Sequence, residues 1–96
     1  MGQLTRIAAA EVSLNLMAQY FFDFRSAETF SADDEGIELL DAEAAHSMAL
    51  GALVDAAREA VMEGSTDQSF AVEVRNGTGP VLEVTAVFNS RIFRKQ

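Results

Sequence analysis

Alternation of aromatic and more polar residues predicts the first strand of this chain. One set of alternate positions is aromatic: Tyr20, Phe22 and Phe24. The positions between them form a more polar set: Gln19, Phe21 and Asp23. Successive side chains of a strand point to opposite faces, so residues 19–24 are expected to place an aromatic face on the core.

A polar stretch separates this strand from a second, shorter one. In residues 25–35 the one large apolar side chain is Phe30, and Gly36 closes the stretch. Residues 37–39 then predict a short strand or an extended edge. We expect the two strands to form a loose hairpin.

A long helix is predicted from Ala42 to about Glu63. Asp41 is its expected N-cap, Glu43 favours the positive end of the helix dipole, and Gly64 is the expected C-cap. At 100° per residue, one half carries a wide apolar face: Ala42, Ala45, Ala49, Leu50, Ala52, Leu53, Ala56, Ala57, Ala60 and Val61. About 22 residues give a helix of ~33 Å, so we expect it to overhang strands of ~20–23 Å.

Two further alternating runs predict a β-hairpin. Residues 70–75 and 81–88 flank Asn76-Gly77-Thr78-Gly79-Pro80, which is turn chemistry because Asn and Gly tolerate positive φ and Pro cannot continue a ladder. One face of this hairpin should cover the helix: Phe70, Val72, Val74, Leu82, Val84, Ala86 and Phe88. The other face should hold Glu73, Arg75, Glu83 and Thr85.

The resulting prediction is an α+β domain, a small antiparallel ββαββ sheet with one long amphipathic helix on one face, in two layers. This single domain spans residues 17–88. Residues 89–96 form a basic C-terminal tail, with Arg91, Arg94 and Lys95 around Ile92 and Phe93.

Residues 1–16 form an N-terminal extension with three interpretations. It is a flexible or weakly helical segment, a docked amphipathic helix, or a targeting segment, although Glu11 and Asn15 interrupt its apolar run before signal-peptide length. The internal Met17 adds the hypothesis that translation begins there.

Composition limits the classes of partner. The 96 residues include 15 acidic and 7 basic side chains, a net charge of −8, which repels nucleic acid and anionic membranes. We therefore expect neither as a partner. The absence of cysteine excludes disulfides, thiolate metal sites and cysteine nucleophiles, and it suits a cytoplasmic location, which we expect.

Several segments together resemble a known family. They are Tyr20-Phe21-Phe22-Asp23, the turn Asp33-Asp34-Glu35-Gly36-Ile37-Glu38-Leu39, the helix start Asp41-Ala42-Glu43-Ala44-Ala45, and Val72-Glu73-Val74-Arg75. They resemble a family of small bacterial proteins classified as a domain of unknown function, over Met17 to about Phe88. The resemblance implies a ββαββ domain opened by the aromatic motif, and it supplies no activity and no catalytic residues.

Candidate catalytic chemistry is sparse. His46, the one histidine, is a capping or core-edge residue or, alternatively, a lone base or ligand. The resemblance implies Arg or another polar residue at its position in relatives. No Gly-x-Ser-x-Gly elbow is present, and without cysteine the usual triads are excluded. We expect no enzyme activity and no catalytic residue.

The acidic residues between the first strand and the helix are candidate cation ligands: Asp33, Asp34, Glu35, Glu38 and Asp41. Because they lack the spacing of an EF-hand loop, a solvated turn with an N-cap is favoured over a weak cation site. No helix follows Asn76-Gly77-Thr78-Gly79, so it is not a phosphate loop. We expect no metal and no cofactor.

The position of Asp23 leaves two interpretations. Its alternation with Gln19 favours an exposed or edge position. If Asp23 is buried instead, Arg75 across the sheet is its natural partner.

The leading functional hypothesis is a non-enzymatic protein-interaction or self-association domain. The alternative is a small-molecule-binding domain that uses the helix–sheet gap near His46, Phe22 and Phe24. Apolar side chains on the second sheet face predict a homodimer, face to face or through edge strands, with Phe21, Val81 and Val87 in or near the interface. Met48 and Val54 project from the helix outside its main apolar arc.

Overall fold

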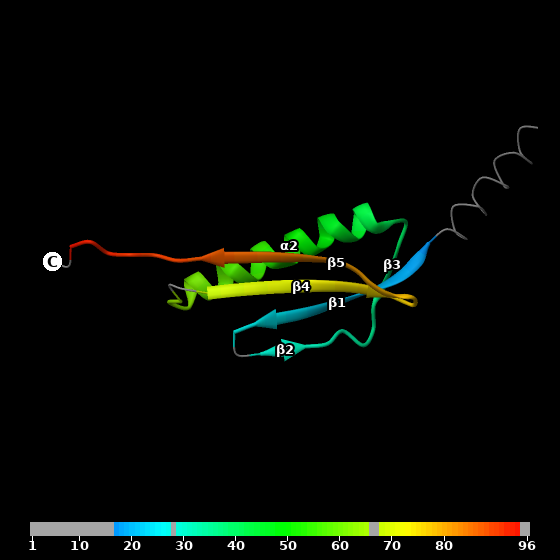
Figure 1. Ribbon diagram of the computed structural model, residues 1–96, viewed down its shortest axis with the longest axis horizontal. Coiled ribbons are helices and arrows are strands. Elements are labelled where there is room, and N and C mark those ends of the chain that lie inside the picture. Colours follow the sequence, from blue (N-terminus) through cyan, green and yellow to red (C-terminus); the bar gives the residue numbers. More distant parts are fainter. Residues whose placement is uncertain (1–16, 28, 66–67, 95–96) are drawn as a thin grey trace, which may run out of the picture.

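The computed structural model describes residues 17–27, 29–65 and 68–94 and shows a two-layer α+β domain (Figure 1). The elements are β1 (Ala18–Ser26), β2 (Phe30–Ser31), β3 (Ile37–Leu39), α2 (Ala42–Met62), β4 (Gln68–Asn76) and β5 (Gly79–Phe88). The five strands form one antiparallel sheet, and α2 packs against β4 and β5. The predicted fold class is confirmed.

β1 lies inside the sheet and β5 lies at its end, in the order β2-β1-β4-β5. β2 and β3 both pair with the same edge of β1, because Phe24 lies opposite Ser31 and Tyr20 lies opposite Ile37. Between these pairs, three residues of β1 face five residues of the connecting segment. The predicted hairpin is therefore present, with a break in its second arm, and β2 is an additional short strand.

The helix has the predicted caps. The Asp41 carboxylate accepts the Ala44 N–H at 2.9 Å. At the other end Gly64, at φ 102°, follows the helix, and the N–H groups of Gly64 and Ser65 donate to the carbonyls of Val61 and Ala60. This is the Schellman arrangement, which satisfies two carbonyls of the last turn.

The core lies between α2 and one face of the strands. Its buried side chains are Tyr20, Ala45, Ala49, Leu53, Phe70, Val72, Val74 and Val84. Phe22, Phe24, Leu82, Ala86 and Phe88 pack around this cluster and are partly buried. The predicted inward faces of β1, β4 and β5 are thus confirmed.

Two expectations about the helix are wrong. β5 has 10 residues and α2 has 21, so both are about 32 Å long and α2 does not overhang the sheet. The buried stripe of α2 is also narrower than the predicted apolar face, because Leu50 and Val61 of that face are exposed. A single helix on a sheet buries only the side chains that point at the strands, whatever lies on its flanks.

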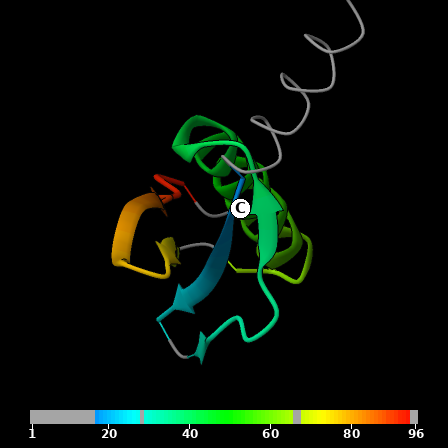
Figure 2. The ribbon, with the colours of Figure 1, turned by 90° about the vertical axis from the view of Figure 1, so that its right-hand side faces the viewer.

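The chain continues beyond β5 as an exposed segment, residues 89–94, which runs on in the direction of the strand (Figure 1). Viewed along the sheet, α2 covers one face, and β2 lies at the edge opposite β5 (Figure 2). In the described part of the chain, no helix has the length and apolarity needed to cross a bilayer.

Candidate functional site

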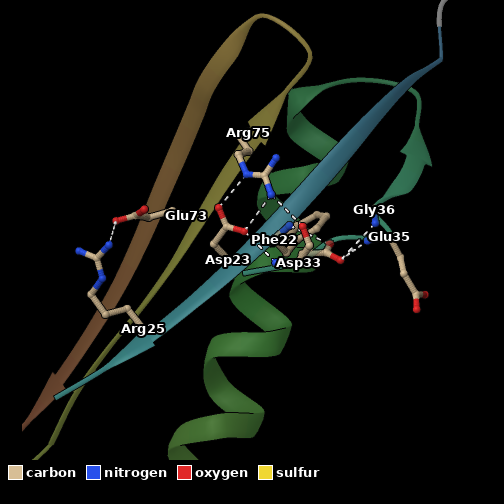
Figure 3. Close-up of polar contacts among 8 residues, drawn as sticks. All are labelled: Phe22, Asp23, Arg25, Asp33, Glu35, Gly36, Glu73 and Arg75. Atoms are coloured by element: carbon tan, nitrogen blue, oxygen red, sulfur yellow. Dashed lines mark hydrogen bonds and ion pairs between the residues drawn. The ribbon is translucent and has the colours of Figure 1, made fainter. Parts of the chain in front are cut away.

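Asp33 fills the break between β2 and β3. Its Oδ2 accepts the N–H of Phe22 at 3.0 Å, and its Oδ1 accepts the N–H groups of Glu35 and Gly36 at 3.0 and 3.1 Å (Figure 3). The Phe22 N–H points to the edge where a continuous strand would have supplied a carbonyl. The Asp33 carboxylate takes the place of that carbonyl and also closes its own turn.

Asp23 and Arg75 join this turn to the centre of the sheet. Arg75 Nε donates to Asp23 Oδ2 at 2.9 Å, and Arg75 Nη2 donates to Asp23 Oδ1 at 3.3 Å and to the Asp33 carbonyl at 2.7 Å. The Asp33 N–H donates to Asp23 Oδ1 at 2.9 Å. Asp23, Asp33 and Arg75 form one network, which we call the polar lock.

The favoured interpretation of Asp23 as an exposed residue is wrong. Its side chain is buried, with 7% of its surface exposed, and the alternative partner, Arg75, is the observed one. Burial of a carboxylate costs free energy unless it is paired, and the two-pronged guanidinium contact provides that pairing. Asp23 therefore belongs to the architecture of the sheet.

The pKa values of both carboxyl groups are lowered. For Asp23 the main cause is the hydrogen bond from Arg75, opposed by desolvation. For Asp33 the cause is hydrogen bonding from the backbone N–H groups of Phe22, Gly36 and Glu35. The Arg75 pKa is raised by the hydrogen bond to Asp23. Each group is held in its charged form by structural partners, the reverse of what a general acid near neutral pH needs.

Aromatic and glycine packing completes the lock. The Arg75 guanidinium carbon lies 4.5 Å from the centre of the Phe21 ring. The backbone of Gly36, at φ 72°, passes so close that an added Cβ would lie 2.9 Å from a Phe21 ring carbon and 3.0 Å from the Tyr20 carbonyl oxygen. Only glycine fits this position without displacement.

The open sheet face beside the lock carries a shallow depression of about 480 Å³. It is lined by Asp23, Glu73, Glu83, Arg75 and apolar residues that include Pro80 and Val81. Three carboxylates, Asp23, Glu73 and Glu83, lie directly across neighbouring strands. Arg75 pairs with Asp23, and Arg25 pairs with Glu73 at 3.4 Å (Figure 3). Glu83, on the end strand, makes no ion pair within the described residues.

Metal binding has no support in this arrangement. Among the residues that the structure describes, no three His, Asp or Glu side chains are placed to hold a metal ion. The interpretation of the acidic turn as solvated missed the role of Asp33, whose carboxylate accepts backbone N–H groups such as that of Glu35. Asp41 acts as the predicted N-cap.

The predicted ligand-binding residues are not brought together in a single pocket. His46 is exposed on α2, whereas Phe22 and Phe24 pack around the core on β1. Phe24 lines a depression of about 250 Å³ with Ser26, Phe70 and the last turns of α2, and neither His46 nor Phe22 contributes to it. Ligand binding near His46 stays a prediction.

The predicted interface residues lie in different environments. Phe21 is half-buried beneath Arg75, and Val81 is partly buried beside the core. Val87 is 68% exposed on the open face of β5. Their role in an interface stays a prediction.

Another exposed apolar surface lies on the flank of α2. Ala56, Glu59 and Glu63 line the depression that includes Phe24 of β1, so that flank faces β1. At 100° per residue, Leu50, Val54 and Val61 fall on the opposite flank, toward β5. These three residues, 42–56% exposed, form what we call the outer stripe. The sequence signal was present for Val54, which was predicted to project outside the main apolar arc, whereas the assignment of Leu50 and Val61 to that arc concealed the rest of the stripe.

The fold and the polar lock together define a small α+β domain. Its sheet has the short strands β2 and β3 at one edge and the ten-residue strand β5 at the other. The chain belongs to the family described as domain of unknown function DUF6894, whose model matches residues 19–87. The matched range runs from β1 to β5 and includes every residue of the polar lock. No curated protein and no solved structure matches the chain.

Proposed function

We propose that this domain is a non-enzymatic protein-interaction module that associates with another chain through the free edge of β5 and the outer stripe beside it. The observation that carries the proposal is the end position of β5, a strand of 10 residues with no second neighbour among the described strands. Long open edges are rare unless they are protected or used for pairing.

The direction of the backbone supports strand addition at this edge. Because the Phe22 N–H points away from β4, the alternation along antiparallel strands directs the N–H and C=O groups of Val84 toward β4. The same alternation directs those of Glu83, Thr85 and Val87 to the free edge. An added strand would satisfy these groups, which is the usual mode of recognition by a sheet edge.

The side chains around the edge support the same proposal. Natural edge strands are protected by charges, prolines or β-bulges, and β5 has a proline, Pro80, and a register shift only at its start. From residue 81 to residue 88, its single charged side chain is Glu83. The outer stripe and Val87 add apolar surface on the two sides of the strand. An incoming strand with apolar side chains would cover both.

The polar lock argues for a binding function over an enzymatic one. Its carboxylates are committed to backbone N–H groups and to Arg75, so they hold the sheet together rather than face a substrate. The residues of the polar lock thus serve the scaffold.

Thr85→Pro tests the proposal, with Thr85→Val as the matched control. Proline removes one outward N–H, and edge strands tolerate it where that group faces solvent. Tagged chains should be captured from cells that also express the untagged chain. We expect specific co-purification, of an untagged copy or another protein, with the original chain and with Thr85→Val, and a strong loss with Thr85→Pro. Equal capture by all three would contradict the proposal.

A further inference from the structure

None of the described strands lies beside the segment after β5. Gln68, the first residue of β4, pairs with Phe88, so residues 89–94 extend past the end of β4. Ile92 is 73% exposed and Phe93 is 84% exposed, large apolar side chains on an extended segment. Arg91 lies 5.7 Å from the centre of the Phe93 ring, so the two side chains share one side of the segment.

The charge of this tail is opposite to that of the domain. Residues 89–96 hold Arg91, Arg94 and Lys95 and no acidic residue, so the tail carries +3. Since the whole chain carries −8, residues 1–88 carry −11. The tail of one chain is therefore attracted to the body of another, which offsets the repulsion between two acidic domains.

We infer that the partner at the free edge is a second copy of this chain, paired antiparallel so that the tail of each copy lies along β5 of the other. This inference rests on the proposed function and names its partner. The two-fold axis passes through Val87. Glu83 then lies opposite Arg91 of the partner subunit, and Thr85 lies opposite the partner's Asn89.

The alternation of the backbone permits this register. β4 and β5 shift register between Val74 and Arg75, so that Val81 is an extra residue on β5. After this shift, the odd-numbered residues of β5 direct their N–H and C=O groups to the free edge, and the same alternation continues into an extended tail. Each hydrogen-bonded pair therefore joins two odd-numbered residues. The ladder runs from Glu83, opposite the partner's Arg91, through Val87 to the symmetric end, and extends pairing along the regular part of β5.

The side chains favour this register over those with the axis at Glu83 or at Thr85. A two-fold axis at Glu83 would place the two copies of Glu83 opposite one another, which is repulsive. An axis at Thr85 would place Glu83 against Val87 of the partner subunit and leave Ile92 and Phe93 unpaired. The axis at Val87 supplies two symmetric Glu83–Arg91 pairs and covers the most exposed valine of the described residues.

This register also covers the remaining apolar surfaces. Ile92 of the partner subunit lies opposite Leu82, on the helix side of the sheet, where it can contact the outer stripe. The partner's Phe93 lies two residues beyond Arg91 of the partner subunit, on the open face of the sheet, where it can reach Val81 at the rim of the 480 Å³ depression. In this closed two-fold dimer, the tail of each copy thus covers the free edge of β5 and the outer stripe of the other copy.

Exchange of the charges of the predicted Glu83–Arg91 pair tests the inference. Sedimentation equilibrium of the full chain should give twice the mass of 10.4 kDa. Arg91→Glu and Glu83→Arg should each weaken the dimer about tenfold, since two attractive pairs become repulsive. The double variant Glu83→Arg/Arg91→Glu should restore the affinity. Asp55→Arg, which changes the net charge by the same +2 as Glu83→Arg at an exposed position of α2 away from the outer stripe, should leave the dimer within about twofold.

Two outcomes would overturn the inference. A dimer that both single variants weaken but that the double variant does not restore has another register. A chain that stays monomeric at high micromolar concentration does not pair with itself. In that case, loss of a different captured protein in Thr85→Pro would still support the proposed interaction function, so the two failures are distinguishable.

Discussion

At the scale of single residues, Asp33 shows how a side chain replaces a stretch of strand. One carboxylate accepts three backbone N–H groups, and the N–H of the same residue reaches Asp23. Without this residue the Phe22 N–H would face a gap in the sheet, because the two extra residues of the connection move the backbone away from β1. A buried N–H without an acceptor costs free energy, so the acidic turn stabilises the fold.

Replacement of Asp33 should measure this contribution. Asp33→Asn removes the charge and one of the two acceptor oxygens, so we expect the free energy of unfolding to fall by about 2 kcal/mol. Asp34→Asn is the matched control, because Asp34 is exposed, and it should change the value by less than about 0.5 kcal/mol. Urea unfolding at one protein concentration provides the measurement. Equal effects of the two variants would rule out the bridging role.

The lowered pKa values of Asp23 and Asp33 predict a specific loss of stability in acid. The unfolded chain titrates near the ordinary value of ~3.9, and the folded chain titrates below it, so the unfolded state binds protons first as the pH falls. The stabilisation is complete at neutral pH, declines from about pH 5 and is lost below the folded pKa values. The stability difference between the original chain and Asp33→Asn should be constant above about pH 5 and narrow below it. A difference independent of pH down to 3 would refute this assignment.

At the scale of elements, replacement of glycine by alanine should change the stability of the fold in opposite directions at two positions. Gly51 lies within α2, where an added Cβ meets nothing within 4 Å, so Gly51→Ala should stabilise the chain by about 0.8 kcal/mol. Gly36→Ala should destabilise it by about 2 kcal/mol or more, because its positive φ and its contacts with Phe21 and Tyr20 leave no room. Thermal unfolding of the two variants compares them directly. A stabilised Gly36→Ala variant would show that the turn adapts freely.

Elements with strong periodicity could be predicted from the sequence. The alternation in β1, β4 and β5 and the caps of α2 each have a local physical cause, and the structure confirms all of them. β2 could not be predicted, because its two residues depend on pairing with β1 and carry no alternation of their own. The prediction that α2 overhangs the sheet was wrong, because turn residues such as Asn76 and Gly79 belong to the strands and lengthen them.

The candidate site was less accessible to sequence reasoning. The pairing of Asp23 with Arg75 was foreseen only as the less favoured alternative, because alternation assigns a face but not the depth of burial. Asp33 lies 10 residues from Asp23 and 42 from Arg75, and only the folded register brings the three together. The spacing from Asp33 to Gly36 is typical of an Asp-initiated turn and was the available signal.

At the scale of the whole molecule, the two edges of the sheet differ: one consists of the short strands β2 and β3, and the other is the long strand β5. On one side, Asp33 of the polar lock binds the connection between the short strands β2 and β3 to β1, and the Gly36 N–H donates to the same carboxylate. The other side presents β5, the outer stripe and a basic tail on an otherwise acidic domain. This asymmetry is the reason for assigning association, the central claim of this account, to β5.

Amide hydrogen exchange along β5, measured by NMR at low and at high protein concentration, tests that claim most directly. The inward N–H groups of Leu82 and Val84 should be protected at both concentrations, because they bond to β4. The outward N–H groups of Glu83, Thr85 and Val87 should exchange rapidly at low concentration and become protected as the chain associates. Doubling of the mass with these three amides still exchanging rapidly would contradict the account and place the interface on another face.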